Sequence, residues 1–286
     1  MWVLYAFSSA FFAGITAILA KIGMKNADSD VVTALRTTVI LCFSWASVFI
    51  MRIDNELSTI ANKSLMYLIL SGISTGTSWV CYFRALQLGD INKIVPIDKS
   101  SVILTMLLAF IFLEEPISIF GIIAMIIIGI GTYLMMQRNK TKAQDTTSNQ
   151  WLIFAILSTL FASLTAILGK VGIAGVDPTI GTAIRTLVIV PMAWVLVFIQ
   201  KKGHLVKNID CQSMVFIIIS GLSTSISWLC YYYALQNGKA SIVVPTDKLS
   251  VVVTIIFGYL FLKETLSLKA IIGLTLIVIG TLLLLL

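Results

Sequence analysis

The sequence has 286 residues, of which 58% are hydrophobic and 12% charged, and its formal net charge at pH 7 is +7. Soluble domains carry about 25% charged residues, so this composition excludes an ordinary soluble domain and indicates an integral membrane protein. In a soluble protein the basic excess would suggest nucleic acid as a partner, but in a membrane protein basic residues at helix ends more often set topology. The expected partner is therefore the lipid bilayer and not nucleic acid.

Apolar runs long enough to span a bilayer, about 20 residues each, occur five times in each half of the chain. Those of the first half are 2–20, 31–51, 64–83, 94–113 and 117–136. Those of the second half are 151–169, 179–199, 213–232, 242–262 and 268–286. We expect an all-α integral membrane fold with ten transmembrane helices, as a multi-pass protein of the cell membrane.

The two halves are copies of one another. Residues 2–137 align without a gap to 151–286 at a constant offset of 149, with roughly two in five positions identical. We divide the chain into a first five-helix repeat at 1–136, a polar linker at 137–150 and a second five-helix repeat at 151–286. Because five is odd, the second copy crosses the membrane in the opposite sense, which is the inverted-topology repeat of many secondary transporters.

The third helix of each repeat is too polar for lipid. One face carries Ser71, Thr75, Ser78 and Tyr82, repeated as Ser220, Thr224, Ser227 and Tyr231, with Trp79 and Trp228 beside it. Serine and threonine alone could bond back to their own helix, but this stripe beside a tryptophan favours a cavity wall with a few hydrogen-bonding groups. By contrast, the small residues Ser9, Ala13 and Thr16 of the first helix are interpreted as packing contacts.

An acid and a base begin the fourth apolar run of each repeat, as Asp98-Lys99 and Asp247-Lys248. They could be a favourable first-turn acid and a lysine that reaches the headgroups. The polar face below each pair favours a role in coupling or charge compensation and extends the cavity wall. That face consists of Ser101 and Thr105 in the first repeat and of Ser250 and Thr254 in the second.

Arginine lies inside the second helix of each repeat, as Arg36 and Arg185. A guanidinium is always charged and has five N–H donors, so it requires a carboxylate, carbonyls or an anionic substrate. A structural pair with a nearby acid is the alternative. Lys170 is expected to anchor its helix at the interface, and Glu115 to cap the helix that follows it.

Motifs for catalysis are missing from the sequence. Its one histidine, His204, lies in a loop, and no P-loop, nucleophile elbow or zinc-protease motif occurs. We therefore expect neither an enzyme nor a bound metal or cofactor.

The chain resembles the EamA branch of the drug/metabolite transporter superfamily. The resemblance rests on Arg36 and Arg185, the stretches Ser78–Gly89 and Ser227–Gly238, the repeated Pro-x-Asp-Lys, and the Phe-Leu-Glu-Glu and Phe-Leu-Lys-Glu helix ends. It covers both halves, and each half is also similar to the five-helix members that assemble from separate subunits. It implies a ten-helix bundle with a central cavity that moves small organic solutes, often outward.

The leading hypothesis is a secondary transporter, an exporter of small organic metabolites that works by alternating access as a monomer or homodimer. A carrier for a lipid-linked sugar and a non-transporting assembly partner are the alternatives. The resemblance implies cytoplasmic termini, whereas most Lys and Arg residues outside the predicted spans lie in loops that face away from the N-terminus. The positive-inside rule then favours termini outside, so both orientations stay open.

Overall fold

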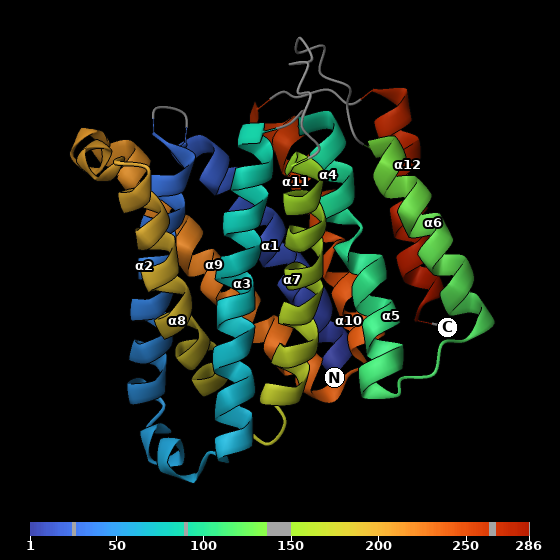
Figure 1. The fold of residues 1–286 in the computed structure, drawn as a ribbon, viewed down its shortest axis with the longest axis horizontal. Helices are drawn as coiled ribbons and strands as arrows, with labels where there is room; N and C mark the ends of the chain where they lie inside the picture. Colours follow the sequence, from blue (N-terminus) through green and yellow to red (C-terminus); the bar gives the residue numbers. More distant parts are fainter. Residues whose placement is uncertain (25–26, 89–90, 136–149, 263–266, 286) are drawn as a thin grey trace.

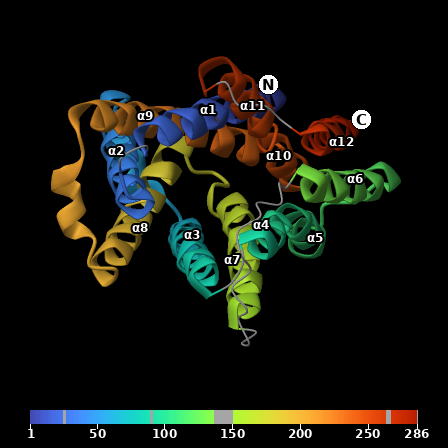
Figure 2. The ribbon, with the colours of Figure 1, turned by 90° about the horizontal axis from the view of Figure 1, so that it is seen from above.

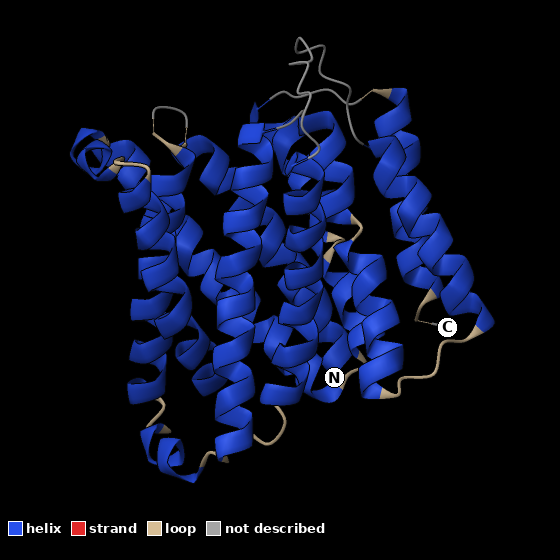
Figure 3. Cartoon of the chain, viewed as in Figure 1, coloured by secondary structure: helices blue, strands red, loops and turns tan. Residues whose placement is uncertain are grey.

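The computed structural model describes residues 1–24, 27–88, 91–135, 150–262 and 267–285. This part of the chain is helical and contains no strand (Figure 3). The predicted linker at 137–150 lies outside the described residues except for Gln150, which begins a helix.

The helices of the two halves follow the same order. The first half contains α1 (Trp2–Gly23), α2 (Ser29–Ile50), η1 (Asp54–Thr59), α3 (Asn62–Leu88), α4 (Ile91–Lys99), α5 (Ser101–Leu113) and α6 (Ile119–Met135). The second contains α7 (Gln150–Gly172), α8 (Pro178–Ile199), η2 (Gly203–Asn208), α9 (Cys211–Asn237), α10 (Ala240–Asp247), α11 (Ser250–Leu262) and α12 (Leu268–Leu283). Asp28 and Asp177 cap α2 and α8 by accepting hydrogen bonds from the amides of Asp30 and Thr179.

The fourth apolar run of each half, predicted as one helix, is broken into two. The first break lies at Ser100, between α4 and α5, and the second at Lys248–Leu249, between α10 and α11. At both breaks the backbone bonds shorten from the i−4 to the i−3 carbonyl, as in Ser100 to Ile97 and Lys248 to Pro245. The freed carbonyl of Ile97 accepts the hydroxyl of Thr159 on α7 at 2.7 Å, so a side chain of the other half stabilises the break.

Membrane-spanning character is clear in several of these helices. Within the described residues, α1, α2, α7, α8, α9 and the segment Ala240–Leu260 are long and apolar enough to cross a bilayer. The helices α6 and α12 are apolar but shorter, with 17 and 16 residues. The 27-residue α3 is long enough but too polar to join them, because it carries the Ser/Thr stripe.

The two halves interleave across the bundle. Helix α1 packs against α9 and α3 against α7, while α2 pairs with α8 and α6 with α12 (Figures 1 and 2). The offset of 149 exchanges α1 with α7 and α3 with α9, so the first two pairs are equivalent contacts. Neither half has a separate core, and the main apolar cluster contains Ala6 and Leu68 together with Ile180 and Leu235.

The pair α6–α12 lies at one edge of the bundle (Figure 2). Its helices approach closely at glycines: a Cβ on Gly273 would lie 2.5 Å from the carbonyl oxygen of Gly131. Large apolar side chains such as Phe120 and Ile126 point outward and are 55% and 58% exposed. Close backbone contact inside and apolar side chains outside are typical of helices in lipid.

Replacing Gly273 by valine should destabilise this edge, because the added side chain overlaps the backbone of α6. Overpacking of this kind costs about 1–3 kcal/mol, which a melting curve of the detergent-purified protein detects as a lower Tm. Gly203→Ala is the control, since its nearest neighbour, in Phe198, would lie at 3.5 Å. An unchanged Tm for Gly273→Val would contradict the close packing.

Candidate functional site

A cavity of about 340 Å³ lies between the two halves, near the helix breaks. Both halves contribute to its wall. The lining residues are Ser9, Ala13, Thr75, Ser78, Trp79, Ser101, Val102 and Thr105 from the first half, and Ala162, Thr165, Ala166, Arg185, Ser227, Trp228, Tyr231, Tyr232, Val244, Asp247 and Lys248 from the second. Aromatic rings and hydroxyl groups together form a wall typical of a small-molecule site.

Hydrogen bonds between the halves fix the aspartates at the two breaks. The hydroxyl of Ser9 donates to Asp247 Oδ1 at 2.7 Å, and its counterpart Ser158 donates to Asp98 Oδ1 at 2.9 Å. Ser227 Oγ donates to the backbone carbonyl of Ser9 at 3.0 Å, and Ser78 Oγ to that of Ser158 at the same distance. Each carboxylate is therefore held by the first helix of the opposite half.

Deeper bonds repeat the same relation. Ser71 Oγ donates to the carbonyl of Thr165 at 2.7 Å, and Ser220 Oγ to that of Thr16 at 3.3 Å. Thr224 lies 3.4 Å from Thr16 through their hydroxyls, as Thr75 does from Thr165. These side chains join the helices and leave few polar groups unsatisfied.

Arg185 is the buried cation of the cavity, with 3% of its surface exposed. Its Nε donates to Ser71 Oγ and its Nη2 to Thr75 Oγ1, both at 3.0 Å. The guanidinium carbon lies 4.6 Å from the ring centre of Tyr232 and 5.9 Å from that of Trp228. Aromatic faces attract such a cation without neutralising it.

The counterpart arginine is arranged differently. Arg36 does not line the cavity, and its buried Nε has no hydrogen-bond partner among the described residues. Asp98 and Lys99 likewise do not line it, whereas their counterparts Asp247 and Lys248 do. The cavity is thus displaced toward the arginine of the second half.

The remaining predicted site residues divide into two groups. Those that line the cavity are Thr75, Ser78, Trp79, Ser101, Thr105, Arg185, Ser227, Trp228, Tyr231, Asp247 and Lys248. Those that lie outside its wall are Arg36, Ser71, Tyr82, Asp98, Lys99, Ser220, Thr224, Ser250 and Thr254. Ser71, Ser220 and Thr224 join helices, Thr254 lies 3.4 Å from the carbonyl of Gly14, and Tyr82 packs against Ala85, Ile94 and Ala155.

Several lining residues were not among the predicted site residues. Ser9 and Ala13 were interpreted as packing contacts, and the same positions of the second half, with Thr165, also line the cavity. Their repetition in both halves was the available signal. Tyr232 gave no such signal, because its counterpart is Phe83.

At one end of the bundle the second half is closed by two charged side chains. Lys170 Nζ donates to the carbonyls of Leu235 and Gly238 at the end of α9, at 2.5 and 2.6 Å. The carboxylate of Glu115 accepts the amides of Ala240 and Ser241, at 2.7 and 2.9 Å. Glu115 thus caps α10 rather than the helix after it, and Lys170 satisfies a helix C-terminus.

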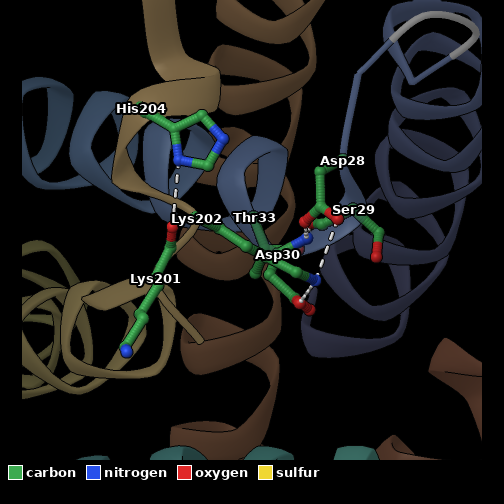
Figure 4. Close-up of polar contacts among 7 residues, drawn as sticks. All are labelled: Asp28, Ser29, Asp30, Thr33, Lys201, Lys202 and His204. Atoms are coloured by element: carbon green, nitrogen blue, oxygen red, sulfur yellow. Dashed lines mark hydrogen bonds and ion pairs between the residues drawn. The ribbon is translucent and has the colours of Figure 1, made fainter. Parts of the chain in front are cut away.

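A different cluster joins the halves at the opposite end (Figures 1 and 4). Nζ of Lys202, which follows α8, contacts Asp28 at 2.9 Å and also pairs with Asp30, both at the start of α2. Partial burial alone would raise the pKa of Asp28, but Lys202 lowers it below its ordinary value of 3.8. The same pairs raise the pKa of Lys202 above 10.5, against the effect of its burial.

This ion-pair cluster has no equivalent in the other repeat. The counterparts of Lys202 and Asp30 are Ile53 and Thr179, which cannot form an ion pair. The two ends of the α2–α8 pair are therefore closed by different chemistry.

Comparisons with known proteins agree with the membrane fold. A profile of the EamA-like transporter family matches residues 1–137 and 149–286. An uncharacterized transporter from the cobO 3' region of a Sinorhizobium species is 42% identical over 134 residues, which cover 47% of this chain and 95% of that protein. The uncharacterized Bacillus subtilis transporter YxxF is 21% identical over 63% of this chain and 56% of its own length.

A solved crystal structure shares the fold, with a TM-score of 0.78 over 99% of this chain and 96% of the other. The two sequences are 13% identical, so the likeness concerns the fold alone.

Replacing Lys202 by isoleucine, the residue of the other repeat, should lower the free energy of unfolding by about 1 kcal/mol at pH 7. Lys201→Gln is the control, because Lys201 forms no ion pair with Asp28 or Asp30 in Figure 4. Equal melting temperatures for Lys202→Ile and the wild type would show that the cluster contributes no stability.

The contribution of the cluster should depend on pH in a defined direction. The lowered pKa of Asp28 stabilises the folded state above pH 3.8, and this is lost as the pH falls through the folded-state value. The raised pKa of Lys202 stabilises it below pH 10.5, and this is lost as the pH rises through the folded-state value. The difference in Tm between wild type and Lys202→Ile should thus be largest between these limits and shrink outside them.

Proposed function

Because the chain belongs to the EamA-like transporter family, we propose that it is a secondary transporter that exports small organic metabolites across the cell membrane. The premise is that it is a multi-pass membrane protein of a transporter family. The proposal adds the substrate class, the direction and a mechanism of alternating access through the cavity between the repeats.

The observation that carries the proposal is the wall of that cavity. Hydroxyl groups, indole rings and ionisable side chains from both halves gather in the interior of a bundle whose outer surface is apolar. Polar groups inside a membrane are costly, so they are typical of a substrate pathway. A wall built by two repeats also allows each repeat to move against the other around one site.

The proposed topology has ten spans in two inverted five-helix repeats. In this scheme α4 with α5, and α10 with α11, each form one broken span, and α3, α6 and α12 complete the set. Broken spans with exposed backbone beside a cavity are a recurring feature of transporter substrate sites. We propose a monomer or homodimer, with no catalytic step and no cofactor.

Asp98 and Asp247 are the proposed coupling residues. Each lies at a helix break, is followed by a lysine, and accepts a serine hydroxyl of the opposite half. Protonation would convert such a carboxylate from an acceptor into a donor and so change the bond between the halves.

The variant with both Asp98→Asn and Asp247→Asn tests coupling, because asparagine can still accept the serine hydroxyl but cannot take up a proton. In proteoliposomes supplied with a panel of organic metabolites, transport by the wild type should vary with pH, and transport by the variant should lose that dependence. Asp177→Asn, at a helix cap outside the cavity, is the control. An unaltered pH profile in the double variant would reject this role.

Cysteine labelling tests the cavity itself. After replacement of the native cysteines, Ser101→Cys in the cavity wall should react with a water-soluble thiol reagent. Ser225→Cys is the matched control, because Ser225 is fully buried, bonds to the carbonyl of Gly221 and does not line the cavity. Equal and slow labelling of both cysteines, in membranes opened to reagent from both sides, would contradict a water-filled pathway.

A further inference from the structure

The charges of the cavity do not balance. Among the described residues, the charged side chains in its wall are Arg185, Lys248 and Asp247, which sum to +1 − 1 + 1, a net +1. A net charge in a membrane interior is unfavourable unless a ligand or a neighbouring group compensates it. The excess cation is therefore a feature that a bound molecule could complete.

Arg185 is the cation that lacks an acid. Its described partners are the neutral hydroxyls of Ser71 and Thr75, and no acidic side chain forms an ion pair with it among the described residues. Asp247 instead accepts the hydroxyl of Ser9. Two N–H groups of Arg185 are thus used by hydroxyl oxygens, and the amino group Nη1 has no partner in the described part of the chain.

The geometry holds this guanidinium in one orientation. Nε and Nη2 are fixed by α3, and the ring of Tyr232 lies 4.6 Å from the guanidinium carbon. The planar arginine fork matches a carboxylate better than any single N–H donor does. Because Arg36 lies outside the cavity wall, this arrangement belongs to the second half and is not a packing device shared by both repeats.

The rest of the wall suits an apolar body. Trp79, Trp228 and Tyr231 line the same cavity as Arg185. Its volume of about 340 Å³ lies at the small end of the ligand-site range of roughly 300–1,000 Å³. Flat aromatic faces and a small volume favour a compact molecule with a ring or a branched chain.

We propose that the substrate is a small organic anion whose single carboxylate binds the guanidinium of Arg185 while its apolar part packs against Trp79, Trp228 and Tyr231. This inference rests on the proposed transport function and names the substrate class of that cavity. The anion neutralises the net positive charge of the site. Asp247 remains free to bind a proton in the same cavity.

The test uses four compounds of nearly equal shape: phenylacetate, phenylacetamide, phenethylamine and phenylalanine. Each is added to the detergent-purified full-length protein, and the Tm is followed as a function of concentration. Phenylacetate should raise the Tm, because a ligand that binds only the folded state stabilises it. The neutral amide and the amine should produce no comparable shift.

The variant Arg185→Gln should weaken the binding of phenylacetate by about 10- to 100-fold, as expected for loss of hydrogen bonds to a charged group. Arg185→Lys keeps the charge without the fork and should fall between Arg185→Gln and the wild type. Arg84→Gln is the control, because Arg84 is exposed, bonds to Gln87 and lies outside the cavity wall. A monodisperse gel-filtration profile shows that each variant is folded.

The remaining outcomes would overturn the proposal. A shift with phenethylamine or phenylacetamide but not phenylacetate, or phenylacetate binding that survives in both Arg185 variants, would reject the anion and leave a transporter of another solute class. Binding of phenylalanine alone would identify a zwitterion, with Asp247 as the partner of its ammonium group. No binding by any compound would also reject the anion, and cysteine labelling at Ser101 would then decide separately whether the pathway exists.

Discussion

The structure depends on one constraint: a polar group inside a membrane needs a partner, because the lipid provides none. Here the partners come from the opposite half. Ser9 and Ser158 donate to Asp247 and Asp98, and Ser71 and Ser220 donate to carbonyls of α7 and α1. Separation of the halves would leave these groups unsatisfied, which accounts for interleaved repeats in place of two adjacent bundles.

The helix breaks follow from the same constraint. Where the backbone bonds shorten at Ser100 and at Lys248, carbonyls leave the helical ladder and require other donors, such as the hydroxyl of Thr159. Irregular backbone at membrane depth is tolerated where it lies against protein or a cavity. The breaks therefore lie beside the cavity, and the charged residues next to them are in contact with it or with its supporting helices.

Duplication produced two similar halves, yet the residues around the cavity and at the ends have diverged. Arg185 is bonded and lines the cavity, while Arg36 is buried with an unpartnered Nε. An ion-pair cluster closes one end of the α2–α8 pair, and Ile53 and Thr179 occupy the corresponding positions of the other repeat. Equal ends would suit a symmetric exchange, whereas these differences give the two faces of the protein unequal stability.

The sequence by itself determined the helical membrane class, the repeat and the polar stripes, because hydropathy, a constant offset and helical spacing are local properties. The helix on which a given hydroxyl acts is not local: Ser71 and Ser220 belong to the predicted stripe but join helices, whereas Ser9 and Tyr232 line the cavity. Only the tertiary structure decided which of two equivalent arginines lines the cavity and where the fourth span breaks. Both depend on which partner the opposite half places within hydrogen-bonding distance.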